Sequence, residues 1–149
     1  MDNRLLEKEK RAYVSLYKKD VLPYSLILCA ILAELIYDIM ILDVMPVSYL
    51  MGVTVMINIL ILFVLFTCAV KVNIYHKIWA FISAILGIYM LVRMSVLVPF
   101  VLKPYARHTE IMTANLLGGI ILLTAGFVSL KHTNRRQRLQ EQLQQSDVS

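Results

Sequence analysis

The sequence predicts an all-α integral membrane protein, organised as an antiparallel four-transmembrane-helix bundle with an N-terminal amphipathic helix. Three observations support this fold class. Of the 149 residues, 59% are hydrophobic, whereas soluble domains contain about 45–50%. Four apolar runs are each at least as long as the ~20 residues that a helix needs to cross about 30 Å of hydrocarbon. The lysines and arginines gather beside these runs, as they do at the ends of transmembrane helices.

The first segment, residues 1–20, is densely charged. Leu6, Tyr13, Leu16 and Tyr17 recur among its charges at near-helical spacing. This pattern is typical of an amphipathic helix that lies on a membrane surface. We therefore expect a cytoplasmic amphipathic helix here, and docking of a partner protein is the alternative use of the same segment.

The four apolar runs form one transmembrane domain over residues 21–130. Pro23 fits the first turn of the first helix, where a missing N–H costs little, and Pro46 ends that helix. Trp79 lies at the start of the third run, as interfacial aromatic residues do. The expected spans are 21–45, 47–70, 78–102 and 111–130. A basic, glutamine-rich tail follows over residues 131–149, with a composition able to extend the last helix.

The basic residues predict the orientation of the bundle. Of the 15 lysines and arginines, all but three lie in the first segment, in the loop 71–77 or in the tail. Because cytoplasmic loops carry the excess of lysine and arginine, we expect both termini in the cytoplasm. The net charge of +5 then reflects topology and contacts of the basic cytoplasmic ends with anionic lipid, and we expect no nucleic acid partner. We expect a bacterial cytoplasmic membrane, and the lack of an N-x-S/T acceptor site is compatible with that source.

Three ionisable side chains stand inside the apolar runs. Glu34 and Asp38 are four residues apart in the first run and share one helix face, and Arg93 is the only basic residue inside another run. At ~1.5 Å per residue, Glu34 lies roughly 20 Å, Arg93 roughly 22 Å and Asp38 roughly 26 Å from the cytoplasmic edge. Because charges inside a membrane need partners, we predict that the first and third helices touch and that Arg93 bridges both carboxylates.

Other polar residues are expected to complete this network. Tyr37 and Tyr89 should lie on neighbouring faces, and Asn58 lies at a similar depth in the second run. Two acids and one base leave a formal charge of minus one. That count fits a structural network with one protonated carboxyl, and it also fits the coupling site of a proton or cation carrier.

The fourth run carries a stripe of small residues and no charge. Ala114 and Gly118 are four residues apart, and Ala125 continues the stripe seven residues later. Such stripes let helix backbones approach closely, inside one chain or between subunits. An exposed Asn115 and Gly118 would favour an oligomer. The expected helix-packing or oligomer face consists of Ala114, Asn115, Gly118, Gly119 and Ala125.

Cysteine and histidine usage gives no sign of redox or metal chemistry. Cys29 and Cys68 form no CxxC motif and lie in apolar runs, where they are expected to pack as small hydrophobic side chains. No two histidines have the spacing of metal ligands. The sequence therefore predicts no metal site, no cofactor and no catalytic residue.

These patterns predict a non-enzymatic polytopic membrane protein that acts as a subunit or accessory protein of a membrane assembly. The expected partners are the lipid bilayer and either further copies of the chain or other membrane subunits. The alternative is a small oligomeric proton- or cation-coupled transporter or channel in which Glu34 is the coupling acid.

Overall fold

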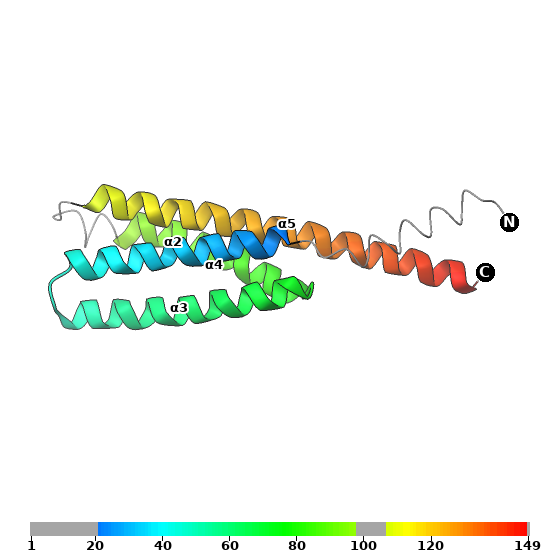
Figure 1. The fold of residues 1–149 in the computed structure, drawn as a ribbon, viewed down its shortest axis with the longest axis horizontal. Coiled ribbons are helices and arrows are strands. Elements are labelled where there is room, and N and C mark those ends of the chain that lie inside the picture. Colours follow the sequence, from blue (N-terminus) through cyan, green and yellow to red (C-terminus); the bar gives the residue numbers. More distant parts are fainter. Residues whose placement is uncertain (1–20, 98–106, 149) are drawn as a thin grey trace.

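The computed structural model describes residues 21–97 and 107–148, and all regular structure in these residues is α-helical. The helices are α2 (Leu22–Val44), α3 (Tyr49–Asn73), α4 (Lys77–Leu97) and α5 (His108–Val148). Consecutive helices run in opposite directions, and α5 extends far beyond the ends of the other three (Figure 1). The amphipathic helix predicted for residues 1–20, the end of the third run and Lys103 fall outside the described residues.

Short sequence signals set the ends of α2 and α3. Pro23 occupies the first turn of α2, and the helix ends at Val44, shortly before Pro46, because proline disfavours helical backbone in the residue that precedes it. Ser48 caps α3, since its Oγ accepts a hydrogen bond of 3.2 Å from the N–H of Met51. The two helices are therefore joined by a tight connection.

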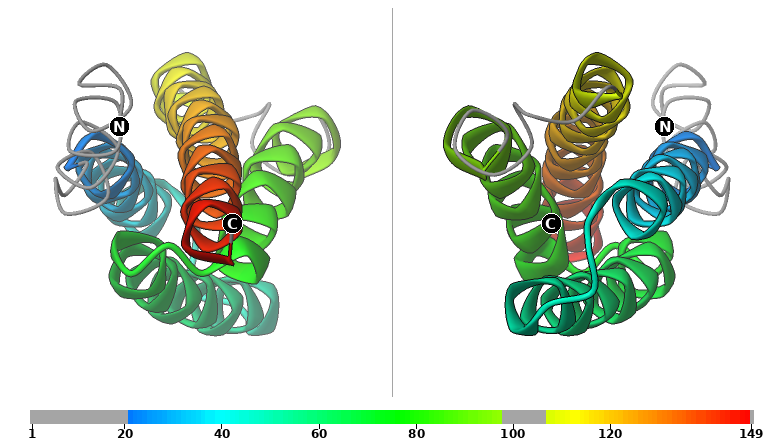
Figure 2. Two further views of the ribbon diagram at one scale, coloured as in Figure 1. Left: turned by 90° about the vertical axis from the view of Figure 1, so that its right-hand side faces the viewer. Right: turned by 90° about the vertical axis from the view of Figure 1, so that its left-hand side faces the viewer.

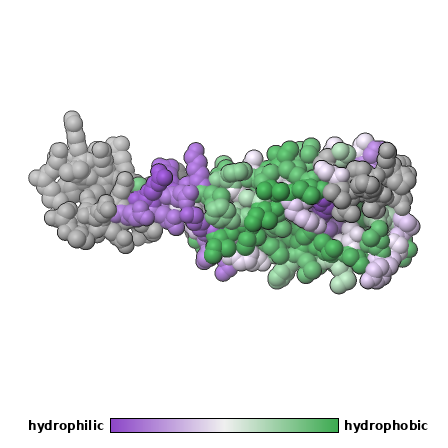
Figure 3. All heavy atoms as spheres, turned by 180° about the vertical axis from the view of Figure 1, so that it is seen from behind, coloured by the Kyte–Doolittle hydropathy of each residue, from purple (hydrophilic) through white to green (hydrophobic). Residues whose placement is uncertain are grey.

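Three helices are long and apolar enough to cross a membrane, namely α2, α3 and the His108–Leu139 part of α5. Their outward faces are apolar, and Ile39, Met56 and Phe63 are each more than half exposed. Hydrophobic residues cover the packed helices in Figure 3, whereas hydrophilic residues cover α5 where it leaves them. Because so large an apolar exterior marks contact with a membrane, these features indicate a membrane protein, as the composition predicted.

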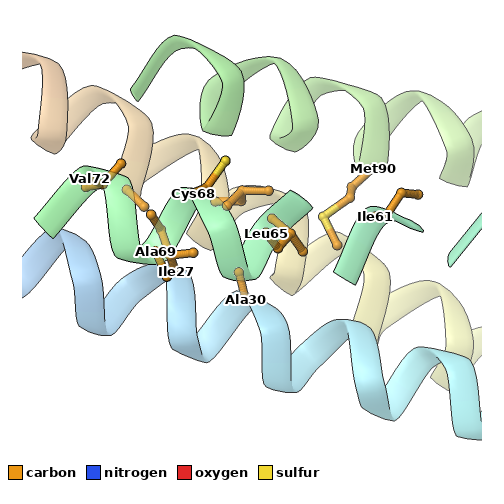
Figure 4. Packing of buried hydrophobic residues seen from close by; sticks show 10 residues of the cluster. Ile27, Ala30, Ile61, Leu65, Cys68, Ala69, Val72 and Met90 are labelled. Carbon is orange, nitrogen blue, oxygen red and sulfur yellow. The ribbon is translucent and has the colours of Figure 1, made fainter. Parts of the chain in front are cut away.

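Helices α2 and α4 lie on opposite sides of the structure, and α3 and α5 separate them (Figure 2). Each of α2 and α4 packs along α5 and contacts α3. The main apolar cluster joins Ile27 and Ala30 of α2 to Leu65 of α3 and Met90 of α4 (Figure 4). The first and third helices contact each other through side chains, as predicted, although the principal neighbours of each are α3 and α5.

The small residues of α5 are used inside the chain. A Cβ atom at Gly126 would lie 2.9 Å from the Cβ atom of Ala84 on α4, and one at Gly118 would lie 3.3 Å from that of Ala33 on α2. A side chain at 126 would block this approach of the two backbones. Ala114 is half-buried, and the buried residues of the stripe are Asn115, Gly118, Gly119 and Ala125. Asn115 and Gly118 are therefore buried within the chain, so the condition that would favour an oligomer surface at these residues is not met.

Candidate functional site

A polar network lies inside the apolar helices and takes one side chain from each of them. Its members are Glu34 of α2, Asn58 of α3, Arg93 of α4 and Asn115 of α5. Their exposed fractions are 0%, 3%, 4% and 0%, so all four are shielded from the surroundings. Buried polar and charged groups are tolerated only when they bond to one another, so the contacts within the network decide what it can do.

The centre of the network is an ion pair between Arg93 and Glu34. Nη1 of Arg93 donates to Oε1 of Glu34 at 2.8 Å, and Nη2 donates to Oε2 at 2.8 Å. Both carboxylate oxygens are thus engaged by the two prongs of one guanidinium, which is the strongest and most directional form of such a pair. Arg93 reaches across the centre of the structure, because α2 and α4 are not adjacent.

Two asparagine amides also bond the terminal nitrogens of the guanidinium, whose buried Nε has no hydrogen-bond partner among the described residues. The side-chain carbonyl of Asn58 accepts from Nη1 at 3.1 Å, and that of Asn115 accepts from Nη2. The amide nitrogen of Asn115 donates in turn to the carbonyl oxygen of Met90 at 2.7 Å, one turn before Arg93 on α4. Each amide therefore accepts a hydrogen bond from Arg93 through its oxygen and donates to a different group through its nitrogen. The guanidinium is thus held by Glu34, Asn58 and Asn115.

Aromatic rings lie against the same guanidinium. Cζ of Arg93 is 4.1 Å from the ring centroid of Tyr37 and 5.8 Å from that of Tyr89. Both distances are within the range of a cation–π contact. The two tyrosines lie beside the network as the sequence predicted, and the fully buried Tyr37 makes the closer contact.

Asp38 is attached to the network through Asn58. Its Oδ1 accepts a hydrogen bond of 2.6 Å from Nδ2 of Asn58. Within the described part of the chain it forms no ion pair with Arg93, whose prongs are occupied by Glu34 and the two amides. The prediction that Arg93 bridges both carboxylates is therefore correct for Glu34 and wrong for Asp38. Asp38 is half-buried, so it lies at the edge of the network.

Asn115 is the member of the network that the sequence analysis assigned to a different role. It was grouped with the small residues of the fourth run because Ala114 and Gly118 flank it. Its amide could have indicated its role in the network, because a single amide in an otherwise apolar span needs a buried hydrogen-bond partner. Arg93 provides that partner.

A second group of charges lies at the C-terminal end of α2 and the start of α5. Nη1 of Arg107 bonds Oδ2 of Asp43 at 3.1 Å, and its Nε donates to Oε2 of Glu110 at 2.9 Å. All three side chains are about half exposed, so each pair contributes little to stability. This cluster links two helix ends and shows no feature of a binding site.

The described residues contain no group of three histidine, cysteine or acidic side chains that could hold a metal ion. Cys29 is exposed and Cys68 is buried, and neither forms a disulfide. Comparison of the chain with protein-family models, curated proteins and solved structures finds no match. The polar network is therefore the feature on which a functional proposal must rest.

Proposed function

We propose that the chain is a non-enzymatic membrane protein whose four helices form an antiparallel transmembrane bundle, and that it acts as a subunit or accessory protein of a membrane assembly. Helix α4 has 21 residues, which at ~1.5 Å per residue gives roughly 30 Å, enough to cross the hydrocarbon. The basic residues Lys71 and Lys77 share an end of the bundle with the basic part of α5. By the positive-inside rule that end is cytoplasmic.

The observation that carries this proposal is the contribution of one buried polar side chain from each helix to a single network. Both oxygens of Glu34 are bonded to Arg93. A carboxylate held in this way is a poor proton carrier, because protonating it would leave the buried guanidinium of Arg93 without its counter-ion. The network is therefore best suited to locking four helices in one register, which gives an assembly a rigid unit to bind.

The projecting part of α5 offers a surface to such an assembly. The helix continues without interruption from the packed region to Val148, and it extends beyond the other three helices (Figure 1). Because a lone helix gains little stability from its own hydrogen bonds in water, a partner would stabilise it. We expect that partner to be another subunit of the assembly.

The test is the mass of the intact complex, extracted from native membranes in mild detergent, with identification of the chains that co-purify. We expect a foreign chain in fixed stoichiometry. Deletion of residues 140–149 should remove that chain and leave the bundle folded, and Arg107→Gln, which alters only exposed contacts, should retain it. If the protein purifies only as itself, as a monomer or a homo-oligomer, the accessory role is wrong.

A second candidate function is a small transporter or channel for a proton or a cation. The observation in its favour is the charge count, since Arg93 neutralises Glu34 and leaves Asp38 without a counter-ion among the described residues. An uncompensated acid inside a membrane is typical of a coupling site. Asp38 is thus a better coupling acid than Glu34, which the sequence analysis had favoured.

This second candidate is tested by flux in liposomes that contain the purified protein. Asp38→Asn should abolish flux driven by a pH gradient. Asp43→Asn is the matched control, because it makes the same change at an exposed position one and a half turns away, and it should leave flux unchanged. Equal flux in the wild-type and Asp38→Asn proteins would exclude Asp38 from any transport mechanism.

A further inference from the structure

One face of α5 changes from apolar to basic where the helix leaves the packed region. Lys131, Arg135 and Arg138 are spaced by four and three residues, so they lie in one row along the helix. Phe127 lies one turn before this row and is 67% exposed. In Figure 3 the hydrophobic surface gives way to a hydrophilic one along this part of the chain. The row therefore begins at the expected level of the lipid headgroups.

The opposite face of the same helix segment is held by the bundle. Cζ of Arg136 lies 3.4 Å from the ring centroid of Tyr75, which follows α3. This contact directs Arg136 away from the row. The row itself points outward, since Lys131, Arg135 and Arg138 are all exposed.

An open groove of about 600 Å³ lies against the outward face, and all of its described lining residues belong to α5. Basic side chains lie at one part of it and apolar side chains at another. The residues used in the argument are Phe127, Leu130, Lys131, Arg135, Arg138 and Leu139. Such a lining matches a ligand that has an anionic group and a hydrocarbon chain.

We propose that this face of α5 is a binding site for an anionic phospholipid of the cytoplasmic leaflet. The headgroup phosphate accepts hydrogen bonds from Lys131, Arg135 and Arg138, because guanidinium and ammonium groups match phosphate oxygens. One acyl chain lies along Phe127 and Leu130. A free phosphate ion would use only the basic half of the groove, so the exposed Phe127 favours the lipid. The proposal rests on the membrane location of α5 proposed above.

The experiment counts lipid molecules retained by the detergent-extracted full chain in native mass spectrometry, during titration with phosphatidylglycerol or phosphatidylcholine. We expect tighter binding of phosphatidylglycerol. Near a membrane each basic residue contributes a factor of roughly five in affinity, so Arg135→Gln with Arg138→Gln should weaken binding roughly 30-fold. Lys71→Gln with Lys77→Gln is the matched control, because it removes the same charge from the same end of the bundle, and it should leave binding largely unchanged.

Four results would overturn the site. These are equal binding of the two lipids, unchanged binding in the arginine variant, an equal loss in the lysine control, and displacement of the lipid by glycerol phosphate at similar concentration. The last result would identify a free-anion site. Failure of the proposed membrane function is distinguishable, because a chain that remains soluble and monodisperse without detergent would contradict the membrane location itself.

Discussion

Replacement of Arg93 by alanine is the most informative perturbation of the network. It leaves the carboxylate of Glu34 buried without a counter-ion, and removal of one partner of a buried pair costs about 3–5 kcal/mol. Asn58 and Asn115 each lose a donor as well, at about 1 kcal/mol for each unmade bond. We therefore expect a total loss of about 5–7 kcal/mol. Folded proteins have only about 5–15 kcal/mol of stability, so this loss is a large part of the total.

The assay is reversible unfolding in detergent micelles by titration with sodium dodecyl sulfate. Trp79, the only tryptophan of the chain, packs against the apolar cluster and reports unfolding by its fluorescence. Arg107→Ala is the matched control. Arg107 also bonds two carboxylates, those of Asp43 and Glu110, but at an exposed position. Its replacement should lower the free energy of unfolding by only a small fraction of the Arg93 effect.

A double variant distinguishes the contribution of the ion pair to stability from the contribution of side-chain packing. Glu34→Leu with Arg93→Leu removes both charges together, so no buried charge remains unpaired. We expect this variant to be more stable than Arg93→Ala. Two results would refute the role of the ion pair in holding the helices together. One is an Arg93→Ala effect no larger than that of Arg107→Ala. The other is a double variant whose loss equals the sum of the losses in Glu34→Leu alone and Arg93→Leu alone, because residues in one bonded pair must show a coupling energy.

Two further predictions use the same unfolding assay. Gly126→Ala should lower the free energy of unfolding by about 1–3 kcal/mol, since its Cβ would lie 2.9 Å from Ala84. Gly52→Ala, which meets nothing within 4 Å, should raise it by up to about 1 kcal/mol through helix propensity, and equal losses would contradict the close-packing account. Asp38→Asn should leave stability unchanged or higher, because its carbonyl can still accept the bond from Asn58 while the uncompensated charge is removed. A clear loss would mean that the carboxylate of Asp38 has a stabilising counter-ion.

The meeting of Glu34 and Arg93 was predictable from the sequence alone. A helix rises by ~1.5 Å per residue regardless of its side chains, so depth follows from counting along each apolar run. Opposite charges at the same depth in a membrane are expected to pair, because an unpaired charge in hydrocarbon costs several kcal/mol. The helical membrane class was predictable for a similar reason, since three apolar helices of sufficient length follow directly from the hydrophobic pattern.

Counting does not give the rotation of each helix or the order of the helices around the bundle. Asp38 lies one turn from Glu34, and four residues rotate a helix by about 40° beyond a full turn. Because of that rotation, and because Glu34 and the two amides already occupy both terminal nitrogens of Arg93, Asp38 bonds Asn58 instead. Asn115 was assigned to a packing stripe because its neighbours are small. Its role depends on α5 standing between α2 and α4, which periodicity in one run cannot show.

The charge count distinguishes the two roles proposed for the network, which are to hold the helices in register and to carry a charge. A lock requires one acid and one base, and Glu34 with Arg93 provides both. Asp38 adds a second carboxylate. An asparagine at this position could accept the same hydrogen bond from Asn58, and burying its neutral amide would cost less free energy than burying a charged carboxylate. Its presence is therefore unexplained by the lock and favours a function that uses a charge. If Asp38→Asn is stable but inactive in flux, the chain is a carrier whose helices are held by the ion pair. If it is stable and its flux equals that of the wild type, the ion-pair network alone defines the site.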